Sequence, residues 1–156
     1  MKRQNSSAMR LLLVAGVIEV IAGLSHFAMP HFAHQSKGFS LLDQNELSFV
    51  NAGVFSVGIL LMALGAFTIY LSRKEDISTE VLLYYGIIQS VLWLMRIVIE
   101  IVYPIKIPLF QIRQPTVFLL PLFIFEWLLF TIATMLINKK RSSSSVQAEA
   151  QTAGFR

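Results

Sequence analysis

The chain has 156 residues, of which 55% are hydrophobic and only 14% are charged, and its mean hydropathy is +0.65. A soluble domain usually carries about 25% charged residues, so this composition excludes an ordinary water-soluble globule, a disordered chain and a charge-driven nucleic-acid binder. The sequence contains no cysteine, which excludes disulfides, thiolate metal sites and a thiol nucleophile.

Four apolar segments, each long enough to cross a membrane, follow one another along the chain. They cover residues 11–29, 49–71, 81–103 and 116–137. A helix needs about 20 apolar residues to span a bilayer, and lipid offers no partners to the unpaired backbone groups of an open sheet. The sequence therefore predicts an all-α integral membrane four-helix bundle. The first segment is interpreted as a retained span, because it is longer than a signal-peptide core and no clean cleavage site follows it.

Helix-starting and helix-breaking residues mark the ends of these segments. Asp43 and Glu46 precede the second span and Ser78 precedes the third, and residues of these types favour helix N-termini. Pro30 is expected to break the first helix. Three further prolines divide the loop after the third span, namely Pro104, Pro108 and Pro115.

The net charge of +4 is distributed in a way that predicts topology. Nine lysines and arginines lie on the side that carries both termini, Arg96 lies inside the third span, and the other side holds only Lys37, Lys106 and Arg113. Because positively charged loops face the cytoplasm, we expect residues 1–10 and 139–156 to be cytoplasmic segments flanking a transmembrane domain at 11–138, in the cell membrane of a bacterium. The Ser-, Ala- and Gln-rich composition predicts a disordered tail from Ser142 onward.

Several costly polar side chains interrupt the spans, and such residues usually face the bundle interior or a watery cavity. The ionisable ones are Glu19, His26, Arg96, Glu100 and Glu126, accompanied by Asn51, Gln89, Trp93 and Trp127. Spacings of seven residues return to nearly the same helix face. Such spacings relate Glu19 to His26 and Gln89 to Arg96, and on the second span they connect Asn51, Gly58 and Gly65. The glycines give this last face a smooth surface that permits close helix approach.

The depth of these residues predicts one polar pocket that opens outward. With a rise of about 1.5 Å per residue, Glu19 and Glu126 lie near the span midpoints, and Arg96 and His26 lie nearer the outer end. We expect these four side chains to carry the chemistry. The expected ligand-binding residues around them are Asn51, Gln89, Trp93, Glu100 and Trp127.

The need to pair buried charges restricts the roles of Arg96 and the three glutamates. Arg96 needs a carboxylate partner, since an isolated buried charge costs several kcal/mol; Glu100 is the local candidate, and Glu19 and Glu126 are candidates from other helices. At least one carboxyl group then lacks a cation, and such a group suits a general acid or a proton carrier. The structural alternatives are that Arg96 and Glu100 form an ion pair that only fixes helix rotation, and that the remaining glutamates are packing residues.

All three histidines lie within nine residues, at His26, His31 and His34. Their spacing is not that of a helical zinc pair, so the sequence predicts no metal site, and it contains no cofactor motif. His26 is expected to join Glu19 in the pocket or to hydrogen-bond a neighbour.

Two resemblances to known families complete the sequence evidence. Residues 17–23 (VIEVIAG) resemble the first helix of small multidrug transporters, four-helix proteins with a membrane-embedded glutamate there, although Arg96 and Glu126 have no counterpart in that pattern. Most of the chain is similar to small four-helix bacterial membrane proteins of the DoxX-like kind. The shared features are NELS at 45–48 leading into a glycine-spaced helix, Arg96 late in the third helix, and a proline-rich loop before FEW at 125–127.

Three functions remain open at this stage, and the sequence leaves undecided whether the protein is an enzyme. The first is a pocket that binds or acts on a lipophilic small molecule, such as an isoprenoid, quinone or lipid, by acid–base chemistry. The second is a proton-coupled transporter, which would require a homodimer because four helices enclose little space. The third is a non-catalytic accessory subunit of a membrane assembly. All three place the chain in a lipid bilayer and none involves nucleic acid.

Overall fold

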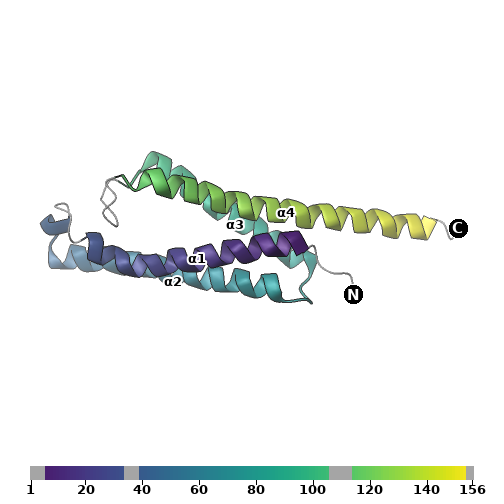
Figure 1. The fold of residues 1–156 in the computed structure, drawn as a ribbon, viewed down its shortest axis with the longest axis horizontal. Helices are drawn as coiled ribbons and strands as arrows, with labels where there is room; N and C mark the ends of the chain where they lie inside the picture. Colours follow the sequence, from purple (N-terminus) through teal and green to yellow (C-terminus); the bar gives the residue numbers. More distant parts are fainter. Residues whose placement is uncertain (1–5, 34–38, 106–113, 154–156) are drawn as a thin grey trace.

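The computed structural model describes residues 6–33, 39–105 and 114–153. Its elements are α1 (Ser6–Ala33), a short 3-10 helix η1 (Phe39–Leu41), α2 (Gln44–Arg73), α3 (Thr79–Val102) and α4 (Thr116–Ala153) (Figure 1). All four α-helices are long and apolar enough to cross a membrane. The prediction of an all-α four-helix membrane protein is confirmed.

The helices form two hairpins, α1 with α2 and α3 with α4, and the main contact between the hairpins joins α1 to α4. Figure 1 shows both chain termini at the same end of the bundle, which we call the terminal end. At the opposite end, the loop end, α1 and α3 finish and α2 and α4 begin, and the two hairpins diverge toward it (Figure 1). The cytoplasmic orientation stays a prediction, and Lys37, Lys106 and Arg113, on which it partly rests, lie outside the described residues.

The outward surface of the helices is apolar. Ile21, Leu60, Ile88 and Met135, one on each helix, all expose more than half of their surface. In water this would be an apolar patch far larger than soluble monomers carry, whereas lipid solvates it without cost. The surface therefore agrees with a multi-pass membrane protein.

Glycines bring α1 and α2 into direct backbone contact. A Cβ atom added to Gly65 would lie 2.6 Å from the carbonyl oxygen of Gly16, and one added to Gly23 would lie 2.7 Å from that of Gly58. Only a residue without a side chain permits this approach. The smooth face predicted from Gly58 and Gly65 is thus the face that packs against α1.

The helix starts agree with the sequence. Asp43 caps α2 by accepting hydrogen bonds from the backbone of Asn45 and Glu46, and the Glu46 carboxylate accepts the backbone N–H of Asp43 at 2.9 Å. This reciprocal capping box satisfies backbone donors that would otherwise lack partners. Ser78 caps α3 through the N–H of Val81 at 3.2 Å.

Two helices extend beyond their predicted ends. α1 continues through Pro30 to Ala33, because a proline in the last turn removes little of the helical hydrogen bonding. α4 continues to Ala153, across the segment for which disorder was predicted. That segment contains alanine, glutamine and glutamate, which favour helix, and residues 142–153 include no glycine or proline.

Candidate functional site

Glu19 lies in the middle of α1 and is fully buried. Its Oε1 accepts a hydrogen bond from Trp93 Nε1 on α3 at 3.1 Å, and its Oε2 accepts one from Thr68 Oγ1 on α2, also at 3.1 Å. Buried hydrogen bonds of this kind fix a side chain in place. One carboxyl group thus ties three helices together.

A chain of hydrogen bonds continues from Glu19 along α2 and α3. Thr68 Oγ1 and Tyr85 Oη are 2.6 Å apart, and Gln89 Nε2 donates to Tyr85 Oη at 2.7 Å. Both hydroxyl groups also lie near the backbone carbonyl of Leu64, Thr68 at 2.8 Å and Tyr85 at 3.2 Å. The result is a connected polar network inside an apolar bundle.

The hydroxyl groups of Thr68 and Tyr85 form a complete set of hydrogen bonds whether or not Glu19 is protonated. When Glu19 only accepts, Thr68 donates to it and Tyr85 donates to Thr68 or to the carbonyl. When Glu19 carries a proton, it donates to Thr68, Thr68 donates to Tyr85, and Tyr85 donates to the carbonyl of Leu64. Every proton has an acceptor in both arrangements.

Glu126 on α4 is also fully buried, but no described residue forms a hydrogen bond with its side chain. Among the described residues, neither of its carboxyl oxygens has a partner. No described hydrogen bond joins it to Glu19, the fully buried carboxyl group of α1. Together with Glu19, it forms what we call the central site.

Arg96 and Glu100 form a separate cluster toward the loop end. Arg96 Nη2 donates to Glu100 Oε2 at 2.9 Å, so of the three carboxyl groups considered from the sequence the local one is its partner. Glu100 Oε1 accepts two more bonds, from the backbone of Ile105 at 3.1 Å and from Thr116 Oγ1 at 2.7 Å. These bonds connect the end of α3 to the start of α4, which is a structural role.

An aromatic contact joins the cluster to the central site. The Arg96 guanidinium lies 4.3 Å from the ring centre of Phe123, and the rings of Phe123 and Trp93 are 5.8 Å apart. Trp93 in turn donates to Glu19. The polar residues expected to form one pocket are therefore arranged as two groups linked by contacts between aromatic side chains.

The other predicted site residues lie outside the central site. His26 Nδ1 makes a 2.7 Å hydrogen bond with the carbonyl of Ala22 in its own helix, and no described contact joins it to Glu19. Asn51 Oδ1 is buried and without a partner within the described residues. Trp127 packs, partly buried, against the apolar core.

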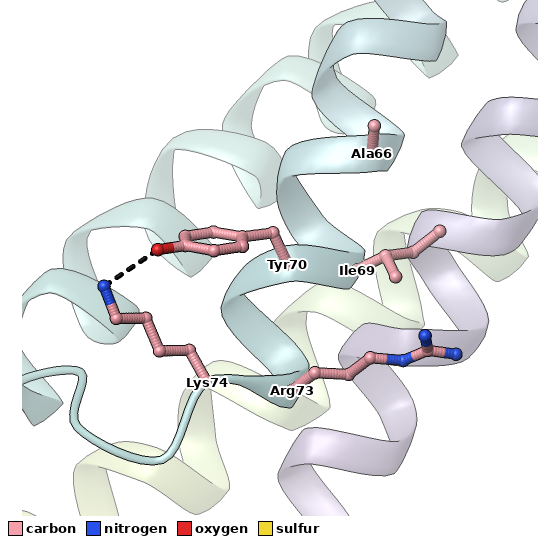
Figure 2. A pocket seen from close by; sticks show the side chains of 5 residues that line it. All are labelled: Ala66, Ile69, Tyr70, Arg73 and Lys74. Atoms are coloured by element: carbon pink, nitrogen blue, oxygen red, sulfur yellow. Dashed lines mark hydrogen bonds between the residues drawn. The ribbon is translucent and has the colours of Figure 1, made fainter.

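The described ranges contain no group of three metal-ligating side chains close enough to hold an ion; His34 lies outside them. A surface hollow lies on α2 near the terminal end, lined by Ala66, Ile69, Tyr70, Arg73 and Lys74 (Figure 2). None of these residues was expected at a site. Thr68, Phe123 and Thr116 were also missed, because threonine and phenylalanine are unremarkable within apolar spans.

A comparison of the chain with known protein families, characterised proteins and solved structures finds no match. The geometry of the central site is therefore the basis for any functional conclusion. That geometry consists of two fully buried carboxyl groups, one held by two donors and the other with none among the described residues.

Proposed function

We propose that this protein binds a lipophilic small molecule in the middle of the bundle and holds a polar group of that molecule between Glu19 and Glu126. Isoprenoids, quinones and lipids combine a long apolar body with a few polar atoms and so suit such a place. If the bound molecule is a substrate, the two carboxyl groups supply acid–base chemistry.

Glu126 is the observation that carries this proposal. Leaving a buried polar group without a hydrogen bond costs about 1–3 kcal/mol, and both oxygens of Glu126 are in that condition within the described part of the chain. Buried polar atoms in native proteins are rarely left so. A polar group of a ligand would supply the missing bond.

The surroundings of Glu126 favour an apolar ligand body. Phe123, Phe130 and Ala133 share its face of α4, by the spacing of three and four residues, and all are buried. A water-soluble ligand would lose its hydration there without replacement. Glu19 would have the complementary role, because Trp93 and Thr68 hold its carboxyl group in a fixed orientation.

Mass spectrometry of molecules retained through purification in a mild detergent tests the proposal. We expect the wild-type protein to retain one lipophilic compound and Glu126→Gln to retain about tenfold less, the effect of losing one charge-assisted hydrogen bond. Glu80→Gln is the matched control, since Glu80 is exposed at the terminal end and pairs with Arg141. Equal retention by wild type and Glu126→Gln would refute the proposal.

Proton-coupled transport is the second candidate, and the hydroxyl groups of Thr68 and Tyr85 favour it. Thr68 Oγ1 lies 3.1 Å from Glu19 Oε2 and 2.6 Å from Tyr85 Oη, so the two hydroxyl groups continue a hydrogen-bonded path for a proton from Glu19. In liposomes, Glu19→Gln should abolish proton release driven by a transported cation; persistent release would exclude Glu19 as the coupling residue.

The proposed location is the cytoplasmic membrane of a bacterium, with the terminal end inside. The excess of lysine and arginine at that end supports this orientation. Labelling of single cysteines introduced at Ser143 and Ser40 in intact cells tests it, and labelling of Ser143→Cys by an impermeant reagent would reverse the orientation.

A further inference from the structure

The hollow on α2 has an apolar part and a basic part. Ala66 and Ile69 lie on the side of the bundle middle, whereas Arg73 and Lys74 lie at the end of the helix. In Figure 2, Ile69 and Arg73 extend toward the neighbouring helix α1, and Tyr70 and Lys74 extend the opposite way. The polarity thus changes along the helix axis, from hydrocarbon to cation within about two turns.

One of the two cations at this hollow is oriented by a neighbouring side chain, and the other has no described ion-pair partner. Lys74 Nζ donates to Tyr70 Oη at 2.8 Å and lies 5.2 Å from the centre of its ring. This hydrogen bond raises the pKa of Lys74 above its usual value. Arg73 forms no ion pair with any described residue, whereas Arg141, at the same end of the bundle, pairs with Glu80 at 3.2 Å.

Two acidic residues follow in the chain, but they do not occupy the hollow. Glu75 and Asp76 are absent from its lining, although Asp76 interacts electrostatically with Lys74. The C-terminal end of α2 also carries a partial negative charge, equivalent to about half an elementary charge. Two full cations outweigh this partial charge, so the hollow favours an anion.

We propose that this hollow binds an anionic phospholipid, with the lipid phosphate at the basic end, which Arg73 and Lys74 flank from opposite sides, and an acyl chain against Ala66 and Ile69. The order of the groups matches such a lipid, whose charged phosphate lies at the boundary of the hydrocarbon layer. α2 crosses that boundary near Arg73, where its apolar sequence ends. Ala66 is exposed, and its small side chain leaves room for a chain beside the helix.

Native mass spectrometry of the full-length protein, titrated in detergent with dioleoylphosphatidylglycerol or dioleoylphosphatidylcholine, tests the proposal. We expect tighter binding of the anionic lipid and a loss of about fivefold for Arg73→Gln and for Lys74→Gln, as for a basic residue near an anionic surface. Arg141→Gln is the matched control, because it removes the same charge at the same end but outside the hollow. It should bind as the wild type does.

A second variant tests the acyl chain without changing any charge. Ala66→Phe fills the apolar part and should weaken binding of the anionic lipid, while circular dichroism verifies that the helices are intact; Ala66→Leu replaces it if the larger side chain prevents folding. The proposal fails if both lipids bind equally, if Arg141→Gln weakens binding as much as Arg73→Gln, or if filling the hollow has no effect. It also fails if glycerol 3-phosphate competes as well as the lipid, because the site would then take the phosphate alone.

Discussion

Glu100 and Glu126 are both fully buried glutamates within membrane-spanning helices, yet their surroundings differ completely. Glu100 binds Arg96, the backbone of Ile105 and the hydroxyl of Thr116, whereas no described residue binds Glu126. Burial alone marks both as costly. The number of partners separates a carboxyl group that holds two helices together from one that, in the proposed function, receives a ligand.

Glu19 lies between these extremes. Trp93 and Thr68 each donate one bond to it, and the donors are neutral, so no cation compensates its charge within the described contacts. Neutral donors orient a carboxyl group while permitting it to gain or lose a proton. A permanent cation such as Arg96, which cannot be deprotonated in a protein, would restrict it to one form.

The largest expected effect is at Glu100. Glu100→Ala leaves Arg96 without its carboxylate and two donors without an acceptor, and removing one partner of a buried pair costs about 3–5 kcal/mol. We expect the low end of that range, because the Arg96 side chain is 33% exposed and reaches solvent. Chemical unfolding in detergent, followed by circular dichroism, measures the loss.

Removing the carboxyl group of Glu126 tests the other half of the comparison with Glu100. Glu126→Leu removes a carboxyl group that has no described partner, so the free energy of unfolding should stay the same or rise by about 1 kcal/mol. If Glu126→Leu destabilises the protein as much as Glu100→Ala does, Glu126 has a structural role and the distinction between the two regions is wrong.

The second prediction concerns the contact between α1 and α2 that keeps Thr68 near Glu19. In Gly65→Ala the new Cβ would lie 2.6 Å from the Gly16 carbonyl oxygen and 2.9 Å from Glu19 Cβ, so the helices must separate. Overpacking of this kind costs about 1–3 kcal/mol. Unfolding in detergent should show this loss together with weaker ligand retention.

Gly53→Ala is the matched control on the same helix, since nothing lies within 4 Å of its added Cβ. Alanine favours helix over glycine by about 1 kcal/mol, so this variant should be neutral or more stable. Equal effects of the two substitutions would mean that close helix approach does not determine the geometry around Glu19.

The fold was predictable because it depends on local features. Long apolar runs predicted the four spans, glycines at a spacing of seven predicted the face of α2 that packs on α1, and Asp43 with Glu46 predicted where α2 begins. The end of α4 was not predictable from composition alone. Serines suggested disorder there, while the alanines and glutamines among them continue the helix.

The candidate site was predictable only in part, because partner choice depends on contacts between helices. Glu19, Glu126 and Gln89 could be identified by their polarity, but the sequence left three carboxyl groups as candidates for Arg96. Thr116, whose hydrogen bond to Glu100 gives that carboxyl group its structural role, lies on the next helix, beyond the loop that follows α3. Thr68 was the one residue with an available signal, since it follows Gly65 by three positions on the face that packs against α1.

The third prediction tests the hydroxyl network. Thr68→Val keeps the shape of the side chain but removes a donor to Glu19 and an acceptor for Tyr85, so we expect a loss of about 1 kcal/mol. A double-mutant cycle with Glu19→Gln should show coupling between the two positions. Thr131→Val is the control, because Thr131 Oγ1 has no partner among the described residues; additive effects of Thr68 and Glu19 would contradict the network.

The smallest expected effect concerns the exposed hydrogen bond between Lys74 and Tyr70. In Tyr70→Phe the hydroxyl group that raises the pKa of Lys74 is lost, so this pKa should fall toward its usual value, near 10.4. Because the native pKa is the higher one, the contact stabilises the fold below the unfolded value and ceases to do so as the pH rises through the native value. The two proteins should therefore differ slightly at neutral pH and converge in strong alkali. Acylation rates measured against pH by mass spectrometry should rise at Lys74 and stay constant at Lys139. Unchanged rates at Lys74 would mean that the Tyr70 hydroxyl does not orient the ammonium group.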